Sequence, residues 1–286
     1  MHLPNGPLQL FVCLGNAMAE SPVPLHLREL LDLMSSPLPA PPALRVAEIA
    51  LFLDVDGTLL EIEREPGAVH VPERLCAILA ELNQATDGAL ALVSGRSVTQ
   101  LDCLFSPLRL SAAGLHGLER RNLQSGTVRS EPDPAVFEPL RARLNAFADR
   151  HPGVLLEDKE LTLALHYRKA PELAQEAMAV ARDAVAASKG ALVLLEGKMV
   201  LELKPPGYDK GQAIAAFMEE PPFRGHRPVF AGDDVTDEAG FAIINRLGGI
   251  SIRIGDDARP TVAIYGHRDV GSMQNWLLGL LAAVAA

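Results

Sequence analysis

Short apolar runs alternate with helical patterns from residue 46 onwards, and no other feature of the sequence restricts the fold as strongly. The apolar run over 49–53 precedes a helical pattern over 72–86, and the apolar run in 88–95 precedes a second helix from Ser97 towards Phe105. Strands that alternate with helices in this way form a parallel sheet covered on both faces. The sequence therefore predicts an α/β fold with a doubly wound parallel sheet at its core.

The alternation is interrupted after a third expected strand in 109–117. A helix over 135–150 is followed by two strand-like runs in 154–168, and a helix over 171–188 is followed by two more in 191–204. This order of helix, hairpin, helix and hairpin is typical of an inserted α+β module. We expect an N-terminal extension with a Pro-rich linker over 1–45, a first part of the core over 46–118, the inserted module over 119–204 and a second part of the core over 205–286.

The two ends of this arrangement carry further expected elements. An amphipathic helix is expected over 25–34, before the Pro-rich run "SSPLPAPPALR", and no function can be assigned to it. After Pro205 and Pro206 the pattern predicts a helix over 210–220, a strand over 228–232, a helix over 237–247, a strand over 250–255 and a last helix over 276–286.

The composition argues against a nucleic-acid or membrane partner. A net charge of −10 and a pI near 5.3 are unfavourable for either partner, because both would need a basic face to neutralise phosphates. No Lys or Arg precedes the apolar stretch over 8–15, so we expect no secretory signal, and 276–286 is shorter than the ~20 residues of a membrane span. The widely spaced Cys13, Cys76 and Cys103 indicate reduced thiols and a cytoplasmic location. We expect a monomer and leave a dimer open.

Polar side chains follow three of the expected strands at the point where each strand ends. Because the carboxyl ends of parallel strands meet at one edge of the sheet, these side chains are expected to converge. Residues i and i+2 of a strand also leave it on the same side. The residues concerned are Asp54 and Asp56, Ser94, and Asp233 and Asp234, with Lys210 at the start of the helix after the insertion.

Four carboxylates at one edge repel each other unless a positive charge lies among them. Magnesium, held by Asp54, Asp56, Asp233 and Asp234, fits because it prefers oxygen ligands and accepts substrate phosphate. An ammonium from Lys210, a hydroxyl from Ser94 and the backbone amides of the Asp-Gly-Thr turn would complete a site for a phosphoryl group. Asp54 could then attack phosphorus to form an aspartyl-phosphate, with Asp56 as its acid–base partner.

Each of these residues also has a purely structural interpretation. Asp-Gly between two apolar runs is a strong β-hairpin signal, so Asp56 and Gly57 could simply turn the chain. Ser94 could belong to a simple loop, and Lys210 could be a solvated residue at a helix start. The segment "GDDVTDE" could be an N-cap with acidic residues in the first helical turn. The occurrence of all four at successive strand ends favours a site.

The motifs "DVDGTL", "VSGR", "DKG" and "GDDVTDE", in this order, resemble those of the haloacid dehalogenase superfamily of aspartate-nucleophile phosphatases. The resemblance implies a Rossmann-like core in which Asp54 is the nucleophile and Asp56 its acid–base partner. The inserted module lies between the second and third motifs, where that superfamily has its larger cap. The sequence is therefore expected to encode a core of this superfamily with an α+β cap.

Longer segments over residues 46 to 280 are similar to the trehalose-6-phosphate phosphatases of that superfamily. They are "GLHGLERR", "LEDKELTLALHYR", "EGKMVLELKPPGYDKG" and "GDDVTDEAGFAIINRLGG". The resemblance implies a small sugar phosphate, trehalose 6-phosphate, as the substrate. A different sugar phosphatase of the superfamily, such as one acting on sucrose phosphate, and a catalytically inactive regulatory module are the alternatives.

Recognition of the sugar is expected from the inserted module. Glu157 and Lys159 are two residues apart on one strand face, and Glu202 breaks an apolar alternation. The pattern alone is also typical of exposed charges on an antiparallel sheet. The family resemblance implies instead that these three side chains hydrogen-bond the sugar hydroxyls, and that Arg96 and His116 also line the pocket.

Overall fold

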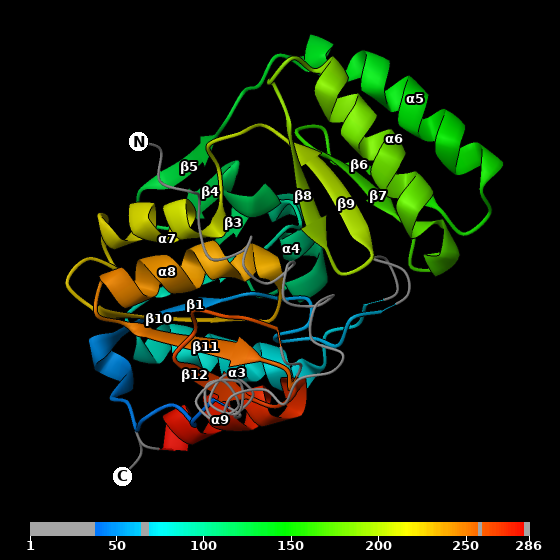
Figure 1. The fold of residues 1–286 in the computed structure, drawn as a ribbon. Coiled ribbons are helices and arrows are strands. Elements are labelled where there is room, and N and C mark those ends of the chain that lie inside the picture. Colours follow the sequence, from blue (N-terminus) through cyan, green and yellow to red (C-terminus); the bar gives the residue numbers. More distant parts are fainter. Residues whose placement is uncertain (1–37, 64–68, 257–258, 283–286) are drawn as a thin grey trace, which may run out of the picture. The chain divides into compact units, whose positions relative to one another are not determined.

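The structure is a computed structural model that describes residues 38–63, 69–256 and 259–282. Within these ranges the chain forms an eight-stranded sheet and a separate four-stranded sheet (Figure 1). The strand order of the larger sheet is β12-β11-β10-β1-β2-β3-β4-β5. Its strands are β1 (Ile49–Leu53), β2 (Leu90–Val93), β3 (Ser111–Gly114), β4 (Glu119–Asn122), β5 (Gly126–Arg129), β10 (Arg227–Gly232), β11 (Ile250–Ile254) and β12 (Tyr265–His267).

Strand β1 lies where the winding of the sheet changes direction. It pairs in parallel with β10 on one side and with β2 on the other. The chain runs outward through β2 and β3, and later outward the opposite way through β10 and β11. A ligand crevice forms beyond the carboxyl ends of the strands at such a switch point. Because β1 has a parallel neighbour on both sides, the hairpin interpretation of Asp56 and Gly57 is wrong.

Helices cover both faces of the large sheet (Figure 1). Alternate residues of β1 serve the two faces, as expected from the period of a strand. Leu51 and Leu53 pack in one core, and Phe52 packs in the other against Phe217 and Phe223. The first core includes α3 (Glu73–Ala85), α4 (Val98–Phe105) and α9 (Val270–Ala282), and the second includes α7 (Lys210–Met218) and α8 (Glu238–Arg246).

The inserted module is an antiparallel sheet with two helices on one face. Its strand order is β6-β7-β9-β8, and the two helices pack on each other. Leu163, Leu165, Leu201 and Leu203 face the helices and form the module's own core, so the alternate residues face away from them. The elements are α5 (Glu138–Arg150), β6 (Leu155–Asp158), β7 (Leu163–His166), α6 (Ala174–Ala187), β8 (Val193–Gly197) and β9 (Val200–Lys204).

The predicted doubly wound parallel sheet is confirmed, and three details differ from expectation. Strands β4 and β5 were not expected, and they pair antiparallel with the large sheet. Both strands lie within the range predicted for the inserted module but belong to the large sheet. The short strand β12 was also not expected, and α9 begins at Val270, earlier than predicted.

The amphipathic helix expected over 25–34 and Cys13 lie outside the described residues. Cys76 and Cys103 lie within them and are free thiols. None of the helices within the described ranges has both the length and the apolar character needed to cross a membrane.

Candidate active site

Asp54 leaves the carboxyl end of β1 and is 4% exposed. Its backbone N–H donates to Ala231 of β10, which keeps the end of β1 aligned with the end of β10. The turn that follows needs glycine at position 57, where φ is +88°. A Cβ at Gly57 would lie 2.2 Å from Oδ2 of Asp233, so the absence of a side chain lets the two strand ends approach each other.

Lys210 joins Asp54 to a carboxylate that was not predicted as a site residue. The Lys210 ammonium donates to Oδ1 of Asp54 at 2.7 Å and to Oδ1 of Asp237 at 2.6 Å. Lys210 is 3% exposed, so it is not the solvated residue that the structural interpretation suggested. Burial by itself would lower the pKa of Lys210, but the charges of Asp237 and Asp54 outweigh it and raise the pKa. The ammonium is therefore held in its charged form beside Asp54.

Asp237 also supports the loop that carries Asp233. Its Oδ2 accepts the backbone N–H groups of Asp233 and Asp234, both at 2.9 Å. The sequence offered one signal for it: Asp237 lies four residues after Asp233, which is the spacing that returns to the same side of a helical turn. Asp237 is fully buried and bonded through both oxygens, which makes it a supporting group for the site.

Asp233 forms an ion pair with a lysine of the inserted module. The Lys198 ammonium, in the turn between β8 and β9, lies 2.5 Å from Oδ2 of Asp233. The backbone N–H of Lys198 donates to Oδ2 of Asp234 at 3.2 Å. The same Asp234 side chain caps the following 3₁₀ helix by accepting from the N–H of Val235. Asp234 is thus bonded to the module turn and to its own loop.

Asp56 and Ser94 lie beside Asp54 and are held by Arg96. The guanidinium donates to both oxygens of the Asp56 carboxylate, each at 2.7 Å. The backbone N–H of Arg96 donates to the Ser94 hydroxyl oxygen at 3.1 Å, which leaves the hydroxyl hydrogen of Ser94 to point at another acceptor. Thr58, a residue not predicted, donates its hydroxyl to Oδ2 of Asp54 at 3.2 Å.

The negative charge around Asp54 and Asp233 exceeds what the two lysines compensate. Burial raises the pKa of Asp54 well above its ordinary value, with Lys210 opposing the rise and Asp237 adding to it. Burial and the charge of Asp237 raise the pKa of Asp233 to about 6, although Lys198 opposes them. Raised values mean that both ionised carboxylates are poorly stabilised here. An additional cation would stabilise them.

The oxygen donors at this point fit a hard divalent cation. Among the described residues, Asp54, Asp233 and Asp237 each place a carboxylate oxygen within 4.8 Å of the others. The predicted ligand set was Asp54, Asp56, Asp233 and Asp234. The side chains of Asp56 and Asp234 are not in this group, because the first turns to Arg96 and the second to the Val235 and Lys198 amides.

The face of the module sheet turned away from its helices carries the predicted recognition residues. The strand register aligns Glu157, Ala164, Glu202 and Leu195 in one row across β6, β7, β9 and β8. This alternation explains why Glu202 interrupts an apolar strand. Its neighbours Leu201 and Leu203 face the helices, and Glu202 faces the pocket.

Glu202 is 5% exposed and accepts hydrogen bonds at both oxygens. Oε1 accepts from the Thr162 hydroxyl at 2.6 Å, and Oε2 lies 3.1 Å from Nε2 of His116 and 3.5 Å from the Lys159 ammonium. Burial would raise the pKa of Glu202, but the charge of Lys159 and the hydrogen bonds from His116 and Thr162 lower it strongly. Glu202 is an ionised, buried group and not an exposed surface charge.

Glu157 is held by two residues that sequence reasoning missed. Gln100 of α4 donates from Nε2 to Oε1 at 2.8 Å, and His166 of β7 lies 2.9 Å from Oε2. Burial would raise the pKa of Glu157, but the His166 hydrogen bond, the Lys159 charge and the Gln100 hydrogen bond lower it to about 2. The Lys159 ammonium also donates to the carbonyl oxygen of Gly95 at 3.0 Å.

His116 reaches Glu202 from the large sheet. It follows β3 in a short 3₁₀ helix, and both Leu115 and His116 have left-handed backbone angles, with φ of 50° and 55°. Non-glycine residues hold such angles only when the surrounding structure enforces them, and they cluster at functional sites. A Cβ at Gly95 would lie 2.7 Å from Nε2 of His116, so glycine there makes room for the ring.

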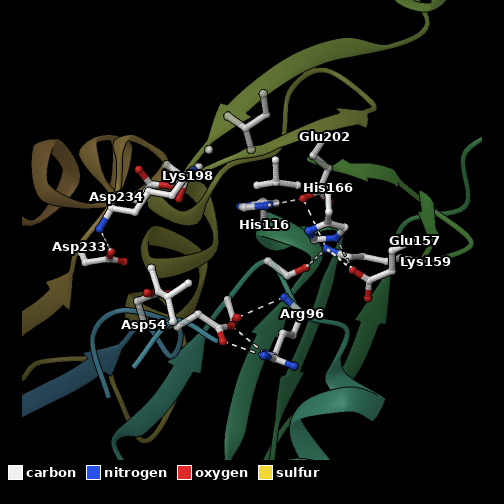
Figure 2. A pocket seen from close by; sticks show the side chains of 18 of the residues that line it. Asp54, Arg96, His116, Glu157, Lys159, His166, Lys198, Glu202, Asp233 and Asp234 are labelled. Carbon is white, nitrogen blue, oxygen red and sulfur yellow. Dashed lines mark hydrogen bonds and ion pairs between the residues drawn. The ribbon is translucent and has the colours of Figure 1, made fainter. Parts of the chain in front are cut away.

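All of the predicted site residues line one pocket (Figure 2). Figure 2 shows Asp233, Asp234 and Lys198 at one end of it, and Glu157, Lys159 and His166 at the other. The predicted site residues that line the pocket are Asp54, Asp56, Ser94, Arg96, His116, Glu157, Lys159, Glu202, Lys210, Asp233 and Asp234. The pocket thus combines a cluster of carboxylates and an ammonium, suited to a phosphoryl group, with a polar face suited to a ligand rich in hydroxyls.

The chain is similar in sequence to known phosphatases over most of its length. Residues 52–270 match the family model described as trehalose-phosphatase. The trehalose-6-phosphate phosphatase of Escherichia coli (strain K12) is 44% identical over 244 residues, which are 85% of this chain and 90% of the relative. The probable trehalose-phosphate phosphatase of Sinorhizobium fredii is 45% identical over 236 residues, which are 82% of this chain and 87% of the relative.

A solved structure shares the fold. The C-terminal domain of the Candida albicans trehalose-6-phosphate phosphatase superimposes with a TM-score of 0.74 at 22% identity, and the match covers 86% of this chain and 98% of that one.

Proposed function

The chain belongs to the trehalose-phosphatase family of phosphoric monoester hydrolases, and on this premise we propose that it converts trehalose 6-phosphate to trehalose and inorganic phosphate. This reaction is the last step of trehalose formation. The observation that carries the proposal is the single pocket in which the buried pair of Asp54 and Lys210 adjoins the polar face of Glu157, Lys159 and Glu202.

The chemistry begins with Asp54. One carboxylate oxygen attacks phosphorus, and the bond between phosphorus and the C6 oxygen of the sugar breaks. The product is an aspartyl-phosphate on Asp54, which divides a difficult hydrolysis into two easier steps. The Lys210 ammonium and the Ser94 hydroxyl hydrogen lie where they can bind the phosphoryl oxygens, and binding charge that develops in the transition state lowers the barrier.

Asp56 moves the protons. In its protonated form it gives a proton to the departing sugar oxygen, and the carboxylate left behind later takes a proton from the water that attacks the aspartyl-phosphate, which releases phosphate and restores both Asp54 and protonated Asp56. The guanidinium of Arg96 holds both Asp56 oxygens in the resting site, so Arg96 orients the acid–base residue. We therefore assign Arg96 a positioning role in addition to the predicted contact with substrate.

Magnesium is the proposed cofactor, with Asp54 and Asp233 as its side-chain ligands. It would supply charge neutralisation at the phosphoryl group and between the carboxylates. Asp237 accepts the Lys210 ammonium and two backbone N–H groups, so it supports these ligands and is not one itself. Asp56 and Asp234, which were predicted as ligands, have other partners through their carboxylates.

The sugar is recognised by unused hydrogen-bonding capacity on the module. An ionised carboxylate offers about four acceptor sites. Glu157 uses two of them on Gln100 and His166, and Glu202 uses three on Thr162, His116 and Lys159. The remaining sites can accept sugar hydroxyls in fixed directions, and mispaired polar groups would disfavour other sugars.

A phosphate-release assay tests the proposal. Trehalose 6-phosphate, sucrose 6-phosphate, glucose 6-phosphate and p-nitrophenyl phosphate are compared by kcat/KM, each with and without magnesium. We expect the highest value for trehalose 6-phosphate, and phosphate release only with the metal. Equal values for all four esters would contradict the substrate assignment, and a preference for sucrose 6-phosphate would favour the alternative sugar phosphatase. Absence of turnover on all of them would favour an inactive regulatory module.

We further propose that the protein acts in the cytoplasm without a nucleic-acid partner. The net charge of −10 supports the absence of a nucleic-acid partner, and the three scattered cysteines support the cytoplasmic location.

A further inference from the structure

The three residues proposed to bind the sugar each take a partner from the large-sheet side of the pocket. Glu157 accepts from Gln100, Lys159 donates to the carbonyl oxygen of Gly95, and Glu202 contacts His116. The distances are 2.8, 3.0 and 3.1 Å. Gly95, Gln100 and His116 follow β2 and β3, whereas their three partners belong to the inserted module. The sugar-binding face is therefore also the surface through which the module contacts the core.

The side-chain amide of Gln100 can have only one orientation. Its Oε1 accepts the backbone N–H of Ser97 at 2.8 Å, while the Ser97 hydroxyl accepts the N–H of Gln100, so the two residues form a capping box at the start of α4. Because the oxygen end is committed to an N–H donor, the nitrogen end must point towards Glu157 as a donor. The helix cap thereby presents a fixed N–H to one oxygen of Glu157.

His116 presents a donor to Glu202 in the same manner. Its Nε2 faces an ionised carboxylate, so that nitrogen carries the hydrogen of the neutral ring. Burial lowers the pKa of His116, although the charge of Glu202 opposes this, so the neutral form is favoured. Within the described part of the chain, Nδ1 of His116 is buried and has no hydrogen-bond partner. Among the described residues, Glu202 is therefore the hydrogen-bond partner of the His116 ring.

We propose that Gln100 and His116 are positioning residues of the sugar site, which fix the carboxylates of Glu157 and Glu202 from the core. This inference rests on the proposed function. The site for the sugar is complete only while the module is docked on α4 and on the segment after β3. A substrate with a sugar gains from that docking, and a small aryl ester that makes no contact with Glu157 or Glu202 gains little.

Two substitutions at position 100 separate positioning from helix capping. Gln100→Glu keeps an acceptor for the Ser97 N–H, because glutamate serves equally in a capping box, but it puts a carboxylate against Glu157. Gln100→Ala removes both interactions. We expect both variants to lower kcat/KM for trehalose 6-phosphate by about 10- to 100-fold, the range for loss of a hydrogen bond to a charged group. The loss on p-nitrophenyl phosphate should be much smaller.

Two results would overturn the positioning role of Gln100. If Gln100→Glu behaves as wild type while Gln100→Ala is impaired, Gln100 only caps α4. If both variants lose equally on the sugar phosphate and the aryl ester, Gln100 supports the catalytic core and not the sugar site. In either case wild-type turnover of trehalose 6-phosphate leaves the proposed function intact.

The matching pair at position 116 is His116→Gln and His116→Ala. A glutamine amide nitrogen reaches the place of Nε2 and can still donate to Glu202, whereas alanine cannot. We expect alanine to raise KM for trehalose 6-phosphate and glutamine to restore most of the loss. Equal impairment by both substitutions would show that the ring itself is required, and the positioning role would be wrong.

A double-mutant cycle tests the contact without any substrate. Gln100→Ala, Glu157→Ala and the double variant are unfolded with urea, and the losses of stability are compared. We expect the double variant to lose less than the sum of the single variants, because residues in direct contact are not additive. Additive losses would refute the contact. This measurement also decides the structural part of the inference if the wild-type enzyme does not act on trehalose 6-phosphate.

Discussion

Removal of the Glu202 carboxylate should reduce both the stability of the protein and its preference for trehalose 6-phosphate over p-nitrophenyl phosphate. In Glu202→Ala the Lys159 ammonium, with its side chain 9% exposed, loses the nearest negative charge at 3.5 Å. The Thr162 hydroxyl and Nε2 of His116 lose their acceptor as well. Removing one partner of a buried ion pair costs about 3–5 kcal/mol when the other charge is left uncompensated. Because Glu157 stays 3.9 Å from the Lys159 ammonium, we expect the free energy of unfolding to fall by an amount at or below the lower end of that range.

Glu202→Gln should have a smaller effect on stability. The amide oxygen can still accept from His116, and the amide nitrogen can donate to the Thr162 oxygen, so only the charge opposite Lys159 is lost. Glu196→Ala is a matched control on the neighbouring strand β8. Glu196 is 58% exposed and lies 3.7 Å from Arg182, and such surface pairs contribute about 0–1 kcal/mol.

Urea unfolding at neutral pH measures all three variants. We expect the order of destabilisation to be Glu202→Ala, then Glu202→Gln, then Glu196→Ala. In parallel, Glu202→Ala should lower kcat/KM for trehalose 6-phosphate much more than for p-nitrophenyl phosphate, because a remote contact lowers the barrier only for a substrate that makes it. A Glu202→Ala protein as stable as Glu196→Ala, or an equal loss on both esters, would refute this reasoning.

Three further predictions concern the nucleophile, the metal and pH. Asp54→Asn should abolish phosphate release from every ester, because an amide is a poor nucleophile towards phosphorus, and turnover retained on any ester would exclude the aspartyl-phosphate. Chelation should abolish activity and magnesium should restore it, while Asp233→Ala should weaken magnesium binding in calorimetry. Unchanged affinity would remove Asp233 from the ligands. Glu157 has a pKa lowered to about 2 from its ordinary 4.5, so its contribution to stability is present above pH 4.5 and is lost as pH falls towards 2. Glu157→Gln should therefore flatten the decline in unfolding free energy over that window, and identical acid profiles for the two proteins would contradict the assignment.

The position of the strands and of their acidic ends could be predicted because those signals are local. Apolar runs of four to six residues between helical patterns identified β1, β2 and β10. The convergence of Asp54 and Asp233 followed from the parallel arrangement alone, since the carboxyl ends of neighbouring strands share one edge. The side of strand β9 on which Glu202 lies could likewise be predicted, because Glu202 alternates with two leucines.

Strand β4 could not be predicted because its polar side chains are satisfied by distant residues. The sequence of β4, "ERRN", has no apolar alternation. Arg121 is buried in this strand and pairs with Asp102, and Arg120 and Asn122 bond Glu220, which lies about a hundred positions away in the sequence. A charged strand can be buried only where such partners arrive, and only the tertiary structure brings them.

The same distinction separates the chemistry of the site from its support. The residue types and their order along the chain were enough to predict Asp54, Lys210 and the acidic strand ends as site residues, and the structure places them in one pocket. The roles of Gln100, Asp237 and His166 depend on which group each side chain faces after the module docks on the core. Hydrogen bonds act over about 3 Å, and whether residues 57 positions apart come that close is decided by packing and not by local pattern.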